Sequence, residues 1–432
     1  MVANNPTKIN NMNENLLQYI WQFQLFNKMN LLTTELNNLI VIHPGNKNDN
    51  QGPDFLNGKI IIANTTWIGS IEIHVKTTDW KLHGHSNDKN YNNVILHVVW
   101  ENDLELNLPF STLELKSLVP KLILKKYEML LRSKQFIPCE KNINFIKELQ
   151  LEKWKETLVF NRLKRKADLI QYELNQNKFD WIQMMWMMIA RAFGGSINGD
   201  AFFQLAKSIP YKLLLRHQND ISTVEAILMG QAGLLDNEFE EVYPTQIKKE
   251  FLFLKHKYHL EKPRIKLLFL RMRPSNFPSV RLAQLSAFIA VNANSIGSFL
   301  NLENTFYFKD YFKMETQSYW DDHFRFDEPS IFQKKKMGET MILHLLVNAI
   351  IPMQFSYGFI MNEEKYISKA MDMLSETKAE KNKIVDNFMQ LKIIPKNALD
   401  SQFLIELKNE YCNLKNCLNC QIGYAIFKSS SN

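Results

Sequence analysis

The spacing of apolar residues differs between the two parts of this chain, and that difference divides the chain into two domains. Between residues 39 and 101 the apolar residues form short β-branched runs separated by glycine, asparagine and aspartate, which is typical of strands. Beyond residue 139 they recur every three or four residues, which is typical of helices. The sequence therefore predicts an α+β fold, with a disordered tail at residues 1–13, a small α/β sheet domain at 14–138 and a larger all-α domain at 139–432.

The same periodicities predict individual elements. Apolar residues between 14 and 27 share one helix face, the runs between 39 and 101 predict a largely antiparallel set of strands, and residues 120–138 return to a helical pattern. Candidate helices of the C-terminal part cover about residues 143–175, 180–193, 199–207, 222–231, 243–257, 278–300, 330–349, 364–378, 380–391 and 400–412.

Composition excludes several classes of protein. Four cysteines in 432 residues are too few for a disulfide scaffold, and no glycine-rich segment has the spacing of a P-loop or a dinucleotide-binding fingerprint. The most apolar run, residues 181–190, is half as long as the roughly 20 residues that span a bilayer, and the N-terminus lacks the apolar segment of a signal peptide. We therefore expect a cytoplasmic protein with no membrane partner. The net charge of +7 permits nucleic acid as a partner without requiring it.

Histidine is concentrated in the N-terminal part, where one short region holds five of the ten: His43, His74, His83, His85 and His97. In the strand expected at residues 71–76, alternation places Glu72, His74 and Lys76 on one face, opposite three apolar side chains. This pattern is compatible with a polar site, but taken alone it is more typical of an ordinary half-buried strand whose polar face is in water.

Asp54 adds a second carboxylate to this face. Pro53 and Asp54 open a strand that we expect to turn through Gly69 into the strand of Glu72, and a hairpin of this length returns Glu72 beside Asp54. Two carboxylates suffice to hold Mg²⁺ or Mn²⁺, because these hard ions take oxygen ligands and keep several waters. A neighbouring His74 or Lys76 can then orient a metal-bound water.

Residues 14–100, with Pro53-Asp54 followed by Glu72-Ile73-His74, resemble the core of the PD-(D/E)XK, restriction-endonuclease-like nucleases. The resemblance implies that Asp54 and Glu72 bind catalytic Mg²⁺ or Mn²⁺, and that the protein is a metal-dependent nucleic-acid phosphodiesterase acting on DNA more than on RNA. His74 stands where that family has its lysine, and Lys76 lies one pleat further along the same face. This departure leaves a second hypothesis, a non-catalytic nucleic-acid-binding or interaction protein that retains the fold.

A second polar cluster follows at His83, His85 and Asp88. Imidazole suits zinc, iron or nickel, so this segment predicts a transition-metal site and, as a third hypothesis, other hydrolytic chemistry. A polar loop whose histidines contact backbone or solvent is the simpler alternative. His97, inside an apolar run, is more typical of a satisfied core histidine than of a ligand.

Longer segments relate the chain to a family. The segments at residues 19–27, 43–55, 67–85, 91–103, 268–288 and 411–423 together resemble the bacterial proteins catalogued as domain of unknown function 2851. These segments extend over nearly the whole chain. The resemblance implies kinship and brings no established activity with it.

Basic residues supply candidate phosphate contacts. Arg271 and Arg273 precede an expected helix that begins near Pro278, and a helix N-terminus flanked by arginines can hold a nucleic-acid phosphate. Three further candidates could track a phosphate backbone: Arg162, Lys164 and Arg165. Internal salt bridges are an alternative for the first pair, and a solvated helix face is the more usual explanation of the second group.

The four cysteines are unevenly placed. Cys412, Cys417 and Cys420 reproduce part of a ferredoxin spacing, so three thiolates could bind one centre with Cys139 as the fourth ligand. Some PD-(D/E)XK helicase-nucleases hold a [4Fe–4S] cluster with one early and three late cysteines, and the resemblance implies a similar cluster here. Zinc in a Cys₄ site and four reduced, buried thiols are the alternatives. A shared centre requires Cys139 to lie beside the C-terminal triplet.

Overall fold

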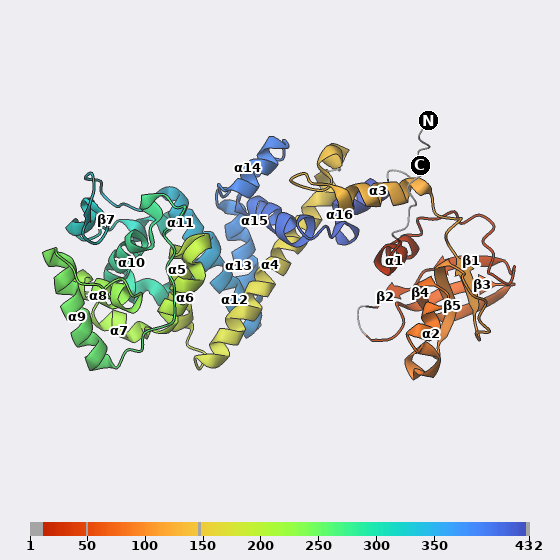
Figure 1. Cartoon of the computed structure of the whole chain (residues 1–432), viewed down its shortest axis with the longest axis horizontal. Helices are drawn as coiled ribbons and strands as arrows, with labels where there is room; N and C mark the ends of the chain where they lie inside the picture. The colour runs from red at the N-terminus through yellow and green to blue at the C-terminus, as the bar shows by residue number, and fades with distance from the viewer. Residues whose placement is uncertain (1–11, 49–50, 146–147, 304, 429–432) are drawn as a thin grey trace, which may run out of the picture. The chain divides into compact units, whose positions relative to one another are not determined.

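The structure is a computed structural model, and it describes residues 12–48, 51–145, 148–303 and 305–428. Contacts divide the chain into two compact units: a sheet unit, Met1–Leu151 with Lys408–Asn432, and a helical unit, Glu152–Leu407 (Figure 1). The α+β fold class expected from the sequence is confirmed. The last segment, with three of the four cysteines, groups with the sheet unit and not with the helices that precede it. The tail expected at residues 1–13 lies outside the described residues, except for its last two.

The sheet is mixed. Its main path runs in the order β1 (Leu39–His43), β3 (Phe55–Ile62), β4 (Thr65–Lys76), β5 (Val94–Glu101) and β6 (Ser111–Glu114), and β2 (Asn46–Lys47) pairs with β3. Pairing is antiparallel from β1 to β4, and parallel from β4 to β5 and from β5 to β6. The largely antiparallel sheet expected from the sequence is therefore wrong for its second half. The connection at residues 77–93 contains α2 (Asp79–Leu82) and two 3₁₀ turns, which makes it long enough for a crossover to a parallel strand.

The hairpin of β3 and β4 brings Asp54 beside Glu72, as expected. Its register pairs Ile62 with Thr65 at the turn and Phe55 with Ile71 at the far end. The turn itself is formed by Ala63 and Asn64, whose positive φ values of 45° and 68° suit a tight hairpin, and not by Gly69. Gly69 instead lies within β4, where a Cβ atom would come within 2.5 Å of the Ile95 side chain on β5.

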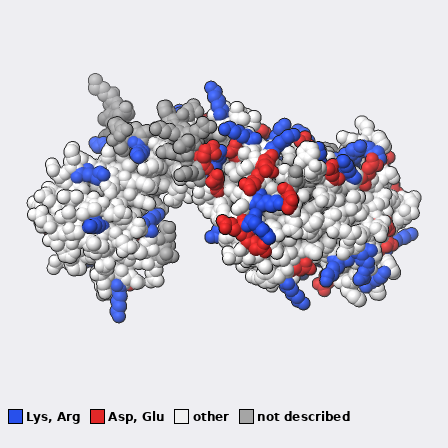
Figure 2. Space-filling model, turned by 180° about the vertical axis from the view of Figure 1, so that it is seen from behind, with Lys and Arg blue, Asp and Glu red and all other residues white. Residues whose placement is uncertain are grey.

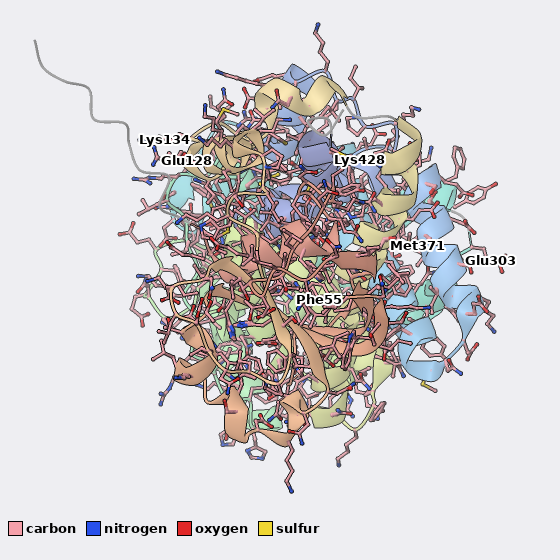
Figure 3. The ribbon with its side chains drawn as sticks, turned by 90° about the vertical axis from the view of Figure 1, so that its right-hand side faces the viewer. Phe55, Glu128, Lys134, Glu303, Met371 and Lys428 are labelled. Carbon is pink, nitrogen blue, oxygen red and sulfur yellow. The ribbon has the colours of Figure 1, made fainter. Side chains whose placement is uncertain are left out.

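Helices at both ends of the chain pack in the sheet unit. In α1 (Glu14–Gln22), capped by the Asn13 side chain, the apolar face expected from the sequence is buried. Near the C-terminus, α16 (Gln421–Lys428) lies by α3 (Lys121–Arg132), where the Lys126 Nζ donates to the Ile426 carbonyl at 2.8 Å. The Phe427 ring also packs against the Tyr19 ring of α1, with 5.4 Å between centroids. Phe55 and Lys428 mark the sheet and α16 in Figure 3.

The helical unit contains most of the helices expected from the sequence: α4 (Glu148–Gln176, which begins in the sheet unit), α5 (Trp181–Phe193), α6 (Gly195–Lys207), α8 (Ile221–Gln231), α9 (Val242–Tyr258), α10 (Pro278–Asn292), α13 (Glu364–Glu376), α14 (Lys383–Gln390) and α15 (Ala398–Glu406). The sequence did not predict α7 (Tyr211–Arg216) or the short pairing of β7 (His323–Arg325) with β8 (Glu328–Pro329). The unit is thus mainly, and not entirely, helical.

The helix expected at residues 330–349 is displaced. It begins after Gly338 as α11 (Glu339–Leu345), passes through a π turn, η8 (Leu346–Ile350), and continues as α12 (Ile351–Met361). Pro352 lacks a backbone N–H, and the π turn just before it accommodates the interrupted hydrogen bonding. Among the described helices, Glu339–Met361 is the one long and apolar enough to cross a membrane, and 67% of its most apolar window is buried within the protein.

Glu225 is a fully buried carboxyl group on α8. Its Oε1 accepts hydrogen bonds from the Trp320 indole N–H at 2.5 Å and from the Tyr243 hydroxyl at 2.9 Å, and its Oε2 has no partner among the described residues. Burial raises the pKa of Glu225 from 4.5 to about 7, although the two hydrogen bonds act in the opposite direction.

We expect Glu225→Gln to remove a pH dependence of stability. Because the folded-state pKa is the higher one, unfolding releases a proton between pH 4.5 and 7, and wild-type stability falls over this range by up to about 3 kcal/mol. The glutamine variant cannot ionise and should lose less stability. Urea unfolding followed by circular dichroism at pH 5 and pH 8 measures the difference, with exposed Glu364→Gln as the control. Parallel pH profiles for wild type and Glu225→Gln would contradict the assignment.

Candidate metal centre

Glu72 and His74 share one face of β4, and both are buried, with 5% and 1% of their surfaces exposed. In an ordinary half-buried strand, these two polar side chains would instead be exposed to water. Here the loop that follows β4 covers this face, and the parallel neighbour β5 contributes His97, which is fully buried. The alternation seen in the sequence therefore leads to an enclosed polar site.

The loop after β4 places two more histidines over the same face. The Asp103 carboxylate accepts hydrogen bonds from the backbone N–H and the hydroxyl of Thr78, which fixes the start of the loop. Buried Trp80 anchors its middle and donates to the Ser86 hydroxyl at 2.9 Å. Gly84, with φ of +73°, then provides the turn between His83 and His85.

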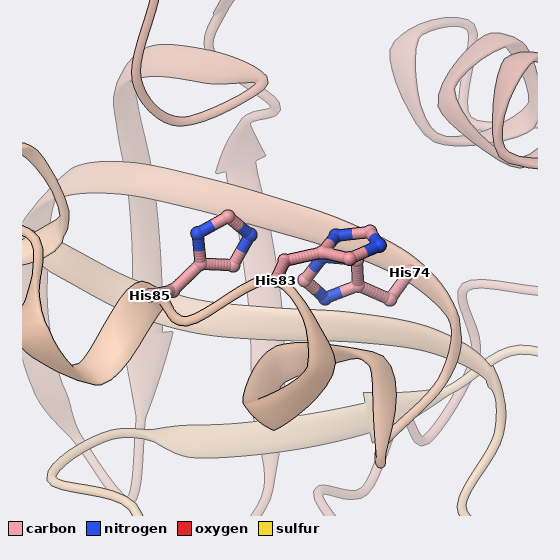
Figure 4. A group of neighbouring side chains, drawn as sticks. All are labelled: His74, His83 and His85. Atoms are coloured by element: carbon pink, nitrogen blue, oxygen red, sulfur yellow. The ribbon is translucent and has the colours of Figure 1, made fainter.

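Three imidazoles, those of His74, His83 and His85, converge at this place (Figure 4), and the Glu72 carboxylate lies beside them. The His74 Nε2 lies 3.1 Å from the His83 Nδ1, and the Glu72 Oε1 lies 3.4 Å from both the His74 Nε2 and the His85 Nε2. The three ligand nitrogens all lie within 4.8 Å of one another. A tetrahedral ion with bonds of about 2.0–2.1 Å separates its ligand atoms by about 3.3 Å. The three nitrogens therefore fit one transition-metal ion, and the Glu72 oxygen lies beside two of them.

The electrostatics of the histidines suit ligation, which requires neutral imidazole. Burial, reinforced by the neighbouring imidazoles, lowers the pKa of His74 to about 2 and that of His97 to about 4, and burial lowers the pKa of His85 as well. The His74 Nδ1 lies 2.9 Å from the His97 Nε2. If His74 donates this hydrogen bond, its Nε2 lone pair faces the cluster, which is the arrangement found in metal-bound histidines.

Glu72 needs a positive partner in this position. Its Oε2 accepts a hydrogen bond from the Asp54 backbone N–H at 3.0 Å, while its Oε1 faces the imidazoles. Burial first, and the Asp54 charge second, raise the pKa of Glu72. Among the described residues no lysine or arginine pairs with this carboxylate, so a bound cation would supply the missing charge.

Asp54 lies beside Glu72 but does not face the imidazoles. Its Oδ1 accepts from the Gln18 amide of α1 at 2.8 Å, and its Oδ2 accepts from the Ile73 backbone N–H at 3.1 Å. Burial raises the pKa of Asp54. With both oxygens engaged, Asp54 fixes the position of β4 and α1. The Mg²⁺ pair expected from the sequence is thus brought together, but the oxygen that faces the cluster belongs to Glu72 alone.

Two other residues expected at the site, Lys76 and Asp88, do not contribute to the histidine cluster. The Lys76 side chain is half exposed and its Nζ lies 3.9 Å from an Asp103 carboxylate oxygen, while Asp88 caps a short turn by accepting from the Asn90 N–H at 2.9 Å. Sequence reasoning missed Tyr91, whose ring stacks on the His85 ring at 3.9 Å between centroids. An aromatic residue six positions after a histidine in a loop gives no usable signal, because the loop path decides this contact.

All four cysteines line one small cavity of the sheet unit, together with Leu130, Pro138, Tyr411 and Gly423. Cys139, Cys417 and Cys420 are buried, and burial raises the pKa of each thiol, to about 12, 11 and 12. The fold-back of Cys139 onto the C-terminal triplet, which the sequence made a condition for a shared centre, is present. Gly423 is required at this place, because a Cβ atom there would collide with the Cys417 carbonyl.

The basic candidates separate into two groups. Arg162 donates to the Gln402 side chain at 2.7 Å, and both Arg162 and Arg165 pair with the buried carboxylate of Glu406. Lys164 stays exposed, over the Phe359 ring. Figure 2 shows basic and acidic side chains interspersed on one face of the helical unit, as such pairing produces. Arg273 instead lines a cavity with other cations, whereas Arg271 is exposed and absent from its lining.

Comparison with known proteins assigns the chain to a family. The model of a family described as protein of unknown function (DUF2851) matches residues 14–383. The chain belongs to this family. No curated protein and no solved structure matches it. The region matched by the DUF2851 model contains every histidine and carboxylate of the candidate metal centre, as well as Cys139, and ends before the three late cysteines.

Proposed function

We propose that the sheet unit is a metal-dependent phosphodiesterase of nucleic acid, whose ion is a transition metal held by Glu72, His74, His83 and His85. The observation that carries this proposal is the convergence of three imidazole nitrogens within 4.8 Å of one another, with a Glu72 carboxylate oxygen 3.4 Å from two of them. Among the described His, Cys, Asp and Glu residues, these three histidines form the one group of three close enough to hold an ion.

The arrangement of the residues suits hydrolysis. Glu72 and His74 are buried and fixed, whereas His83 is exposed, so solvent and a phosphate group can approach from the His83 side. When bound there, a divalent metal lowers the pKa of a water and neutralises charge that develops on a phosphate. His97 holds the orientation of His74, and Asp54 holds Glu72 through its backbone N–H.

Phosphodiesters are the substrate class that the topology favours. Helix α1, strand β1, strand β3 and strand β4 follow one another along the chain, and this order supports the PD-(D/E)XK resemblance. Asp54 immediately precedes β3 and Glu72 lies on β4, which are the places of the two acids in that resemblance. The net charge of +7 is compatible with a polyanionic substrate, and we expect DNA to be preferred to RNA.

A second candidate function is a non-catalytic nucleic-acid-binding or interaction protein that retains the fold. The observation in its favour is that the chain itself offers four ligand atoms, as structural metal sites do, whereas catalytic zinc sites keep a position open. Exposed His83 is the ligand whose departure would open a position.

Metal analysis and a nuclease assay together decide between the two. The purified chain is analysed for bound metals, and single- and double-stranded DNA and RNA are incubated with it in Mn²⁺, Zn²⁺, Fe²⁺ or Mg²⁺. Bound metal with cleavage supports the phosphodiesterase. Bound metal without cleavage of any substrate favours the second function, and absence of any metal binding removes the phosphodiesterase.

His97 provides a test of how His74 is oriented. We expect His97→Gln to weaken metal binding about 10- to 100-fold, because loss of the partner of a metal-bound histidine has typically cost that much. His43→Ala is the control, since His43 is an exposed histidine on β1 that lies outside the cluster. Competition with a chromophoric chelator measures the affinity. Equal affinities in wild type and His97→Gln would show that His97 is only a core residue.

We further propose that Cys139, Cys412, Cys417 and Cys420 hold an iron–sulfur cluster, with a single zinc ion as the alternative. Four thiols around one cavity are the number of ligands that either centre takes. Unlike the histidines, the described cysteines do not form a group close enough to share one ion. This wider spacing favours a cluster, in which each thiolate binds a different iron.

A further inference from the structure

The helical unit contains a cavity of about 690 Å³ that is lined by cations: Arg273, Arg281, Lys334, Lys335, Lys336 and Lys381. The cavity lies between α5, α10, α11 and the segment before α11, and it has the size of a ligand site. None of its described lining residues is aspartate or glutamate. Four of these cations are exposed, and with no acid in the lining the cavity has a positive potential that attracts an anion.

Arg281 is the best placed of these cations. Its guanidinium donates to the Gln284 side-chain oxygen at 2.8 Å and to the Asn276 side-chain oxygen at 2.6 Å, both of them neutral acceptors. Buried Gln284 is itself fixed, because its amide donates to the Lys335 carbonyl at 2.9 Å. The guanidinium is therefore held in place with no carboxylate partner among the described residues, and it keeps donors for a phosphate.

The other cations are only partly neutralised. Lys334 pairs with Asp321 at 2.9 Å, and Lys335 donates to backbone carbonyls. Arg273, Lys336 and Lys381 have no ion pair with any described residue. The cavity thus retains an excess of positive charge, concentrated on side chains that can reach an incoming anion.

The cavity is longer than one phosphate needs. It shares Ser196 and His344 with a second cavity of about 720 Å³, whose lining includes Phe203 and Tyr172. The two carboxylates in that lining, Glu173 and Asp200, are paired with Lys207 and Arg191. The Tyr172 side chain is 62% exposed, so a flat ring is available beside the cationic region. Cations along a groove together with exposed aromatic rings are the two features by which proteins hold single strands, through backbone phosphates and stacked bases.

We propose that this groove of the helical unit binds a single strand of nucleic acid, with phosphates at the cationic cavity and a base on Tyr172. The inference deepens the proposed function by naming the form of its substrate. Binding in the groove does not require the metal centre, so it can be measured where cleavage cannot occur.

The test uses the full chain carrying Glu72→Gln and a fluorescent oligothymidylate, with binding followed by anisotropy at several salt concentrations. Adding Arg273→Ala and Lys336→Ala should weaken binding about 20-fold near 0.1 M salt and lower the slope of log affinity against log salt by about 1.4, since each phosphate contact on a single strand contributes about 0.7. The matched control, Lys212→Ala with Lys249→Ala, removes two exposed cations of the same unit outside the groove.

Tyr172→Ala provides a second, independent readout. Loss of one stacked base should weaken binding about 5- to 100-fold while leaving the salt slope unchanged. Three results would each overturn the proposal. The first is an equal loss of affinity in the groove double variant and in the control double variant. The others are tighter binding to duplex than to the single strand, and displacement of the strand by free tripolyphosphate at low concentration. If binding behaves as expected but the wild type cleaves no nucleic acid, this inference stands and the proposed phosphodiesterase activity is removed.

Discussion

Glu72→Gln is expected to bind transition metal at least about 100-fold more weakly than the wild type and to lose any metal-dependent cleavage. The substitution keeps the shape of the side chain, so the hydrogen bond from the Asp54 N–H to the side-chain oxygen can persist. It removes the negative charge that faces His74 and His85 at 3.4 Å, and with it the single anionic ligand of the set. Removing a ligand should lower metal affinity by more than the 10- to 100-fold that is typical when only a hydrogen-bond partner of a ligand is removed.

His83→Ala tests the same site from its exposed side. Because His83 is exposed, its truncation leaves no cavity in the core, and the fold should remain intact by circular dichroism. The metal affinity should fall about as far as in Glu72→Gln. Glu101→Gln is the matched control for the carboxylate, since Glu101 on β5 pairs with Lys116 outside the cluster. Wild-type metal content in either Glu72→Gln or His83→Ala would exclude the proposed ligand set.

Local rules were enough to predict part of this site. Strand alternation placed Glu72 and His74 on one face, and the length of the hairpin placed Asp54 beside Glu72; the structure shows both. These relations depend only on residues near in sequence. The same rules could not tell that Asp54 would use both oxygens on Gln18 and Ile73, because the position of α1 against β4 is a long-range packing result.

The identity of the ligands depended on the path of a loop. The sequence treated His83 and His85 as a separate cluster, whereas the loop after β4 folds back and joins them to Glu72 and His74. That path follows from the parallel pairing of β4 with β5, which needs a crossover, and periodicity alone did not distinguish this pairing from an antiparallel one.

In the helical unit, the cationic cavity was not predicted from the sequence for a different reason. The run Lys334-Lys335-Lys336 was a visible signal that sequence reasoning left unused. Its meaning depends on Arg281 and Arg273, which come from a segment more than 50 residues away and meet the lysines only in the folded unit. Of the basic residues that the sequence did single out, Arg273 lines this cavity, whereas Arg162 and Arg165 pair with buried Glu406.

Cys420→Ser is expected to remove the bound iron or zinc and to release the C-terminal segment from the sheet unit. Cys420 is buried at the start of α16, and the centre would link this segment to Cys139, which lies more than 270 residues earlier in the chain. Without the centre, α16 keeps only contacts such as the Phe427–Tyr19 ring pair and the Lys126–Ile426 hydrogen bond. A structural metal supplies folding free energy directly, so its loss should expose the segment to protease.

Iron, acid-labile sulfide and zinc are measured on anaerobically purified protein, and limited proteolysis reports whether the C-terminal segment is released. Ile422→Ala is the matched control, because it truncates a buried apolar residue of α16 and leaves the four thiols in place. Iron with sulfide in the wild type and in Ile422→Ala, but not in Cys420→Ser, supports a cluster, and one zinc per chain in the same pattern supports the alternative. A wild type with neither metal, and equal protease resistance in all three proteins, would mean that the four cysteines are simply buried thiols, and that apolar packing of α16 on α1 and α3 alone secures the C-terminus.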